Sequence, residues 1–336
     1  MDKMQAIVLE QQADNPTLHV VEKSTPIPKK GQVLVNIEVA PVNPSDVMFL
    51  TGRYRSIVDT ALPVVPGFVA SGTVVATGGG IIDKCLLGKR VSCGGMSDGD
   101  GTWSQYVLTE SRRCIPLTKN ISFESGSNLL ANPTTAWALL TLVKKGGHKA
   151  AIQNASAGDV GSMMRYLARQ QGIPLINIVR SEEQAEYLHK MGERYVVNSS
   201  DSEYRNQLQS LCHKLQATIG FDAVAGESSQ ELLSAMPVCS ELIVYGKLSD
   251  KNSQLDVFEI IVGRKQRLSG FNLYHWIEGQ SLPELAYHFL RIRWFLSAYG
   301  GMNVQHKVGL TSFVENFNHY IKNTTQGKTL IYPRLG

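Results

Sequence analysis

The stretch AIQNASAGDVG, residues 151–161, separates an apolar, strand-like segment (KAAIQNA) from an amphipathic, helix-like segment (DVGSMMRYLARQQG). At such a strand-to-helix turn, free N–H groups and the positive end of the helix dipole attract an anion. Gly158 permits a tight bend, and Gly161 lets the helix pack close to the strand. We therefore predict that the turn binds the diphosphate of a dinucleotide. The alternative that the sequence leaves open is an ordinary strand-to-helix turn.

The predicted diphosphate contacts lie at the start of the helix. They are Ala157, Gly158, Asp159 and Val160. Asp159 suits the first turn of a helix, but its carboxylate would repel a diphosphate if it pointed inward. We therefore expect this side chain to face solvent.

The next strand-like segment, LINIVR, ends in Arg180, which is 19 residues after Gly161. An NAD-binding unit has an Asp or Glu at this place for the ribose diol, whereas an arginine can bind a 2′-phosphate. One charge-assisted hydrogen bond is worth about 1.5–3 kcal/mol. Arg180 therefore predicts NADPH rather than NADH. The alternative is a surface arginine at the end of a strand.

The segments on either side of the turn belong to a regular alternation of strand-like and helix-like segments. After LINIVR, helix-like and strand-like segments alternate as far as RLSGFNLYHW. This order predicts an α/β fold with a parallel, doubly wound sheet. A helix is expected from about residue 122, with Ser122 as its N-cap. Residues 1 to about 120 read as short strands broken by Gly and Pro, which is typical of a β-rich domain.

Composition excludes several classes of protein. The net charge is +4 with no cluster of Lys and Arg, so we expect no nucleic-acid partner. The five cysteines are widely spaced without a C-x-x-C pair, which favours a reducing cytoplasm over a disulfide framework or a zinc cluster. The most apolar long segment, NLLANPTTAWALLTLV, falls short of a bilayer span. The start, MDKMQAIVLEQQ, lacks the apolar run of a signal peptide, so we expect none. We expect a soluble, cytoplasmic protein.

Several motifs together resemble the medium-chain dehydrogenase/reductase superfamily. They are NPSDVMFLTGRY, PGFVASGTVVATG, GKRVSCG, GTWSQYVL, NPTTAWALL and VYGKLS, in the order that the superfamily has. The resemblance implies a GroES-like, β-rich catalytic domain at residues 1–123, completed by residues 274–336. It also implies a Rossmann domain that binds NADPH at residues 124–273. Dimers are common in the superfamily, so we expect a homodimer through the edge strand in RLSGFNLYHW.

Within the superfamily, the turn resembles that of the 2-enoyl thioester reductases. The quinone reductase turn is one residue shorter, and IQNAS, INIVR, GTW and SGFNLYHW also favour the enoyl reductase branch. The implied reaction is NADPH-dependent reduction of the C=C bond of an enoyl-CoA or enoyl-ACP. Hydride adds to the β-carbon of this α,β-unsaturated carbonyl, and a proton adds to the α-carbon. A zinc-independent quinone or alkenal reductase is the first alternative.

A non-catalytic NADPH-binding protein is the second alternative, from another class. It stays open because Val69 replaces the glutamate of the superfamily pattern PGxExxG. Zinc is not expected, because the zinc alcohol dehydrogenases have Cys at the position of Asn43 and a His-Glu pair at Phe68 and Val69. Hydrogen-bond donors would then have to polarise the substrate.

Tyr54, in TGRY, matches the tyrosine that the enoyl thioester reductases use as proton donor. A phenol has a pKa near 10 and is protonated at neutral pH, so it can donate directly. The alternative is a tyrosine that packs against or shields the nicotinamide.

The resemblance assigns further contacts outside the turn. Asn43 is assigned to the substrate, although an Asn before Pro is otherwise a turn former. Asn132 is assigned to the nicotinamide half of the cofactor. The other cofactor contacts that it implies are Tyr245, Gly246, Phe271, Leu273 and Lys328.

Overall fold

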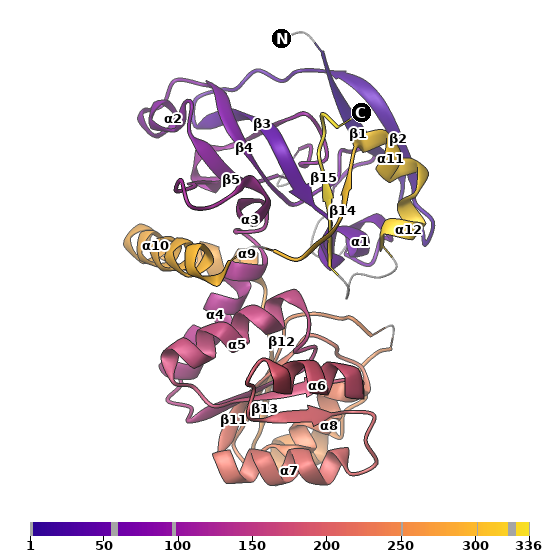
Figure 1. The fold of residues 1–336 in the computed structure, drawn as a ribbon, viewed down its shortest axis with the longest axis vertical. Helices are drawn as coiled ribbons and strands as arrows, with labels where there is room; N and C mark the ends of the chain where they lie inside the picture. Colours follow the sequence, from indigo (N-terminus) through magenta and orange to yellow (C-terminus); the bar gives the residue numbers. More distant parts are fainter. Residues whose placement is uncertain are drawn as a thin grey trace. The chain divides into compact units, whose positions relative to one another are not determined.

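The chain forms two compact units. The computed structural model describes residues 3–54, 60–95, 99–249, 251–300, 302–321 and 327–335 (Figure 1). Unit 1 contains Met1–Ala131 and Phe289–Gly336, and unit 2 contains Asn132–His288.

Unit 2 is built on a six-stranded parallel sheet, with strand order β10-β9-β8-β11-β12-β13. The strands are β8 (Ala150–Gln153), β9 (Leu175–Val179), β10 (Val196–Asn198), β11 (Ala217–Asp222), β12 (Glu241–Val244) and β13 (Arg267–Gly270). The direction of winding reverses between β8 and β11, which makes the carboxyl edge of these two strands the expected place for a ligand. The predicted doubly wound sheet is confirmed.

Helices cover both faces of this sheet. In Figure 1, α4 and α5 lie on one side and pack together, and α7 and α8 lie on the other and pack together. Because both faces are covered, every residue of β8 and β9 is buried. The helices are α4 (Asn132–Lys145), α5 (Asp159–Gln171), α6 (Glu182–Lys190), α7 (Tyr204–Leu215), α8 (Glu227–Ala235), the π-helical turn η2 (Glu259–Gly263) and α9 (Leu273–Glu278). Helix α10 (Leu282–Tyr299) runs from unit 2 into unit 1.

Unit 1 is β-rich. Its strands are β1 (Lys3–Gln11), β2 (Thr17–Ser24), β3 (Gln32–Pro41), β4 (Val69–Thr77), β5 (Arg90–Gly94), β6 (Tyr106–Glu110), β7 (Cys114–Pro116), β14 (Val304–Val308) and β15 (Lys328–Ile331). One sheet has the order β14-β15-β3-β4-β5-β7, with β6 also on β3, and β1 pairs with β2. The short helices are α1 (Pro44–Leu50), α2 (Ile81–Leu86), η1 (Ser111–Arg113), α3 (Phe123–Ser127), α11 (Leu310–Glu315) and α12 (Phe317–Ile321).

The C-terminal tail belongs to unit 1. Strand β15 pairs antiparallel with β3, where Leu330 faces Pro41 and Ile331 faces Ala40. Leu330 and Ile331 are fully buried. The end of the chain therefore shares a sheet with its first 131 residues.

Local signals at helix ends are largely as predicted. Ser122 caps α3, because its hydroxyl accepts a hydrogen bond from the Ser125 N–H at 3.1 Å. Gly172 ends α5 in the left-handed conformation, with φ of 65°. The single helix expected from residue 122 is instead two, α3 and α4. The new start precedes Pro133, where the ring suits a first helical turn but cannot continue a helix from upstream.

No helix among the residues described is both long enough and apolar enough to cross a membrane.

Candidate functional site

The turn between β8 and α5 packs tightly around Gly161. A Cβ added at Gly161 would lie 2.7 Å from Ser156 Cα and 2.8 Å from the carbonyl oxygens of Ala155 and Ser156. Ala155 has a positive φ of 49°, and the Gly158 N–H donates to its carbonyl at 2.9 Å. Only glycine at position 161 allows α5 to begin this close to the turn. The close approach of helix and strand predicted from the sequence is therefore present.

A polar pair connects this turn to the turn after β11. Asn154 Nδ2 donates to Asp222 Oδ1 at 2.5 Å, and Asn154 Oδ1 accepts from the Ala223 N–H at 2.7 Å. Asp222 Oδ1 also accepts from the N–H groups of Val224 and Ala225, at 2.9 and 2.8 Å. These bonds hold the two turns together at the point where the winding of the sheet reverses.

Asp159 is the first residue of α5, and its carboxylate has a polar partner. The residue is half-buried, and Asn132 Nδ2 donates to its carboxylate at 3.3 Å. The residue keeps part of its surface in solvent, and its carboxylate also accepts a hydrogen bond from Asn132, a contact that the expectation of a solvent-facing side chain did not include. Sequence reasoning missed this contact because the two residues are 27 positions apart. Ala157, Gly158 and Val160 are also half-buried, at the start of α5.

Arg180 directly follows β9, which lies next to β8 in the sheet. Since both strands are parallel, their carboxyl ends meet at one edge, and Arg180 lies one strand away from the turn. Its side chain is exposed. Ser181 caps α6 immediately after it, accepting from the Gln184 N–H at 3.3 Å.

Tyr245 and Gly246 follow β12 at the same edge. The Tyr245 N–H donates to the Asp222 carbonyl at 2.9 Å. Burial raises the pKa of the Tyr245 phenol, and the charge of Asp222 raises it further. A Cβ at Gly246 would lie 2.8 Å from the Ala223 carbonyl, so a glycine is needed here as well.

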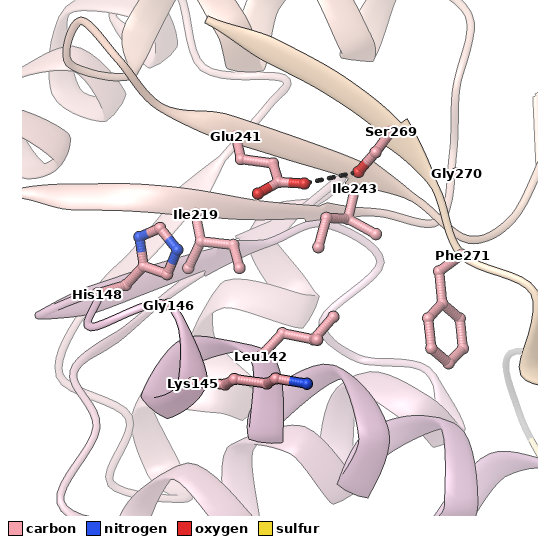
Figure 2. A pocket seen from close by; sticks show the side chains of 10 residues that line it. All are labelled: Leu142, Lys145, Gly146, His148, Ile219, Glu241, Ile243, Ser269, Gly270 and Phe271. Carbon is pink, nitrogen blue, oxygen red and sulfur yellow. Dashed lines mark hydrogen bonds between the residues drawn. The ribbon is translucent and has the colours of Figure 1, made fainter. Parts of the chain in front are cut away.

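Phe271 and Leu273 follow β13. Phe271 lines a cavity of about 280 Å³, which Figure 2 shows between the end of α4 and strands β11, β12 and β13. Ser269 donates to Glu241 Oε1 in its wall at 2.8 Å. The other lining residues are Leu142, Lys145, Gly146, His148, Ile219, Ile243 and Gly270. Of the predicted cofactor contacts, this cavity includes Phe271 alone, while Leu273 begins α9.

The remaining predicted site residues lie in unit 1. Lys328 Nζ donates to Asn43 Oδ1 at 2.9 Å, and Asn43 Nδ2 donates to Asn128 Oδ1 at 3.2 Å. All three residues are buried. Asn43 and Lys328, which were assigned separately to substrate and cofactor, therefore form one hydrogen-bonded group.

Asp46 connects this group to Tyr54. Its carboxylate accepts from the N–H groups of Asn43 at 2.7 Å and Phe68 at 3.0 Å, and burial raises its pKa to about 6. The ring of Phe68 packs edge-on against half-buried Tyr54, with centroids 5.9 Å apart. Burial raises the pKa of the Tyr54 phenol, and the nearby charge of Asp46 adds to the effect. The phenol is therefore protonated at neutral pH, as a proton donor must be.

Sequence reasoning missed two buried charges beneath the turn, Arg165 and Glu193. Arg165 Nη1 lies 3.4 Å from Glu193 Oε1. A signal was present, because Gly161, Arg165 and Ala168 follow the helical spacing of the buried face of α5. A charged residue on such a face requires a buried partner.

Two family models match the chain. Residues 29–119 match the alcohol dehydrogenase GroES-like domain, and residues 160–289 match the zinc-binding dehydrogenase family.

Among the similar proteins, some are named enoyl reductases and others quinone oxidoreductases. The mitochondrial enoyl-[acyl-carrier-protein] reductase of Arabidopsis thaliana is 27% identical over 76% of this chain and 68% of its own length. A protein of Leishmania amazonensis named probable quinone oxidoreductase is 26% identical over 98% of this chain and 97% of its own. A crystal structure from Mesorhizobium loti, provisionally described as an NADPH:quinone reductase, superimposes with a TM-score of 0.90. It is 28% identical and covers 99% of both chains.

The side chains present do not suit a zinc ion. The amide of Asn43 is engaged by Lys328 and Asn128, and Phe68 and Val69 carry hydrocarbon side chains without a ligand atom. In the described ranges, no group of three or more His, Cys, Asp or Glu side chains is arranged to hold a metal ion.

Proposed function

Because the chain belongs to the medium-chain dehydrogenase/reductase superfamily, we propose that it is an NADPH-dependent reductase of 2-enoyl thioesters. Its substrate class is the α,β-unsaturated acyl group of enoyl-CoA or enoyl-ACP. The observation that carries the proposal is that Arg180, directly after the neighbouring strand β9, lies at the same edge of the sheet as the glycine-dependent turn. Protonated Tyr54 supplies the second half of the chemistry.

The turn at β8 fits an anionic dinucleotide. A Cβ added at Gly161 or Gly246 would meet neighbouring backbone atoms, so both glycines keep the segments at this edge closely packed, as the third glycine of a dinucleotide-binding turn does. We assign the diphosphate to Ala157, Gly158, Asp159 and Val160, and the 2′-phosphate to Arg180. The hydrogen bond from Asn132 draws the Asp159 carboxylate aside, which reduces its repulsion of the diphosphate.

The reaction needs a hydride, a proton and a positioned substrate, and we assign each to a group. Bound NADPH supplies the hydride. Tyr54 donates the proton to the α-carbon, and Asn43 helps to position the thioester. Lys328 is proposed as a cofactor contact that acts together with Asn43, because the two side chains are hydrogen-bonded. We also assign Tyr245, Phe271 and Leu273 as contacts of the cofactor.

A turnover comparison tests the substrate class. With NADPH in excess, we expect crotonyl-CoA to be reduced with a higher kcat/KM than a simple quinone. Absorbance at the NADPH band measures both reactions. Faster reduction of the quinone would overturn the thioester assignment in favour of the second candidate, a zinc-independent quinone or alkenal reductase. That candidate is favoured by the relative that matches 98% of this chain.

Titration with NADPH tests the third, non-catalytic candidate. Cofactor fluorescence should report binding at micromolar concentration, and turnover should follow with one of the two substrates. Binding without turnover of either substrate would favour a non-catalytic NADPH-binding protein, in which Val69 has replaced a catalytic-domain glutamate.

Replacing Arg180 with Glu should reverse the cofactor preference. The change removes a guanidinium and adds a carboxylate beside the 2′-phosphate, so we expect NADPH to bind about ten- to hundredfold more weakly. Isothermal titration with NADPH and NADH measures the ratio. Arg194→Glu is the matched control, because exposed Arg194 precedes β10 at the opposite, amino edge of the sheet. Equal losses in both variants would remove Arg180 from the site.

We further propose a cytoplasmic homodimer that uses β13. This strand is the last in the order of the six-stranded sheet, and Leu268 on it is 41% exposed. All five cysteines are free thiols, which supports a reducing compartment. Sedimentation velocity and cell fractionation test the two statements, and a monomer at micromolar concentration would contradict the first.

A further inference from the structure

A buried ion pair lies beneath the turn between β8 and α5. Arg165 is 3% exposed and Glu193 is 8% exposed, and their Nη1 and Oε1 atoms are 3.4 Å apart. Burying two charges is costly unless additional hydrogen bonds satisfy them, and apolar residues of similar volume often stabilise a fold as well or better. The other hydrogen bonds of Arg165 and Glu193 therefore indicate why a charged pair, and not an apolar pair, occupies this place.

The guanidinium holds a carbonyl of the turn. Arg165 Nε donates to the Ser156 carbonyl at 3.2 Å. The Ser156 N–H donates to the Ile178 carbonyl at 3.2 Å, and the Ser156 hydroxyl donates to the Gln153 carbonyl at 3.1 Å. The backbone at Ser156 is thus fixed by three hydrogen bonds from the buried side.

This anchoring sets the direction of the next N–H group. In a trans peptide, the carbonyl of one residue and the N–H of the next point in opposite directions. With the Ser156 carbonyl directed to buried Arg165, the Ala157 N–H points away from the interior. Within the described part of the chain this N–H has no hydrogen-bond acceptor. It is therefore available to an external anion.

A polar network extends the same arrangement to Gly161. Gln153 Nε2 donates to the Gly161 carbonyl at 3.1 Å and to Asn177 Oδ1 at 2.8 Å. Asn177 Nδ2 in turn donates to Glu193 Oε2 at 3.5 Å. Side chains of one network therefore hold carbonyl groups at both ends of the turn.

We propose that Arg165 is a positioning residue for cofactor binding, which aims the Ala157 N–H at the diphosphate of NADPH. The proposal rests on the proposed NADPH-binding function of the turn. Glu193 supports Arg165 by balancing its charge and orienting the guanidinium.

The test separates positioning from stability by removing both charges. In Arg165→Met/Glu193→Met both members of the buried pair are removed. Arg169, whose Nε lies 3.8 Å from Glu193 Oε1, has a side chain that is 48% exposed and stays hydrated, so we expect the melting temperature to stay near that of the unmodified protein. We expect the Kd for NADPH, measured by fluorescence titration, to rise on the order of tenfold, as for the loss of one hydrogen bond. Arg205→Met/Glu231→Met is the matched control, because it removes an exposed ion pair of 3.0 Å from the same unit.

A ligand without a diphosphate provides the second readout. Adenosine 2′-monophosphate carries the 2′-phosphate alone, so its Kd should be the same in the double variant and the unmodified protein. Should the double variant unfold, Arg165→Lys carries the test. Lysine can keep an ion pair with Glu193, but all its donors sit on one nitrogen, whereas Arg165 uses Nη1 for Glu193 and Nε for the Ser156 carbonyl. The fold should therefore persist and the Kd for NADPH should rise.

The possible failures are distinct. If the unmodified protein does not bind NADPH, the proposed function fails. If it does bind, an unchanged Kd for NADPH in the folded double variant or in Arg165→Lys would overturn the positioning role. An equal rise in the Kd for NADPH and adenosine 2′-monophosphate would also overturn it, because a general distortion of the unit would then explain both.

Discussion

Replacing Tyr54 with Phe is expected to lower kcat for an enoyl thioester about 10²- to 10⁴-fold, the usual contribution of a positioned general acid. The ring contact with Phe68 is retained in this variant, since only the hydroxyl is removed. The Kd for NADPH should therefore change little. Steady-state kinetics with crotonyl-CoA and a fluorescence titration with NADPH measure the two quantities.

The pH dependence of turnover adds a second criterion for Tyr54. Because burial raises the pKa of its phenol above the usual 10, the donor keeps its proton throughout the neutral range. Any loss of activity from its ionisation should appear only above pH 10 and be missing in the variant. Tyr106→Phe is the control, because it removes a hydroxyl from unit 1 and keeps the ring beneath Arg334. Unimpaired turnover of the Tyr54 variant would leave this residue with a packing role.

Replacing Gly161 with Ala is the second change expected to have a large effect. The added Cβ would lie 2.7 to 2.8 Å from backbone atoms of Ala155 and Ser156, which cannot rotate away. Forcing a methyl group into a packed site costs about 1–3 kcal/mol. Helix α5 must also shift from the turn, so we expect the Kd for NADPH to rise as well. Denaturant unfolding and cofactor titration measure the two effects.

Alanine substitutions at two other glycines serve as comparisons for Gly161→Ala. At Gly99, which is exposed in unit 1, an added Cβ meets nothing within 4 Å, so Gly99→Ala should unfold at the same denaturant concentration as the unmodified protein. At Gly158 the nearest atom is the Ala155 carbonyl oxygen at 3.2 Å, so Gly158→Ala should be intermediate. If Gly161→Ala bound NADPH as tightly as Gly99→Ala, close packing at the turn would not be required for the cofactor.

Much of the fold could be predicted because its signals are local. The apolar runs of β8 and β9 and the spacing of α5 appear within a few residues, and Gly172 ends the helix through its own φ. The alternation of these segments allows few arrangements other than a doubly wound sheet. Placing Arg180 one strand away from the turn likewise required only the parallel order of two consecutive strands.

Contacts between distant segments were decided only by the tertiary structure. Lys328 lies 285 residues from Asn43, and no periodicity indicates that one buried side chain will satisfy the other. The same is true of Asn132, whose side chain donates a hydrogen bond to the Asp159 carboxylate 27 residues along the chain. The pairing of Arg165 with Glu193 depends on how α5 packs against the segment that leads into β10. Strand and helix periods report which face of an element is buried, but the polar partner on that face is set by the elements packed against it.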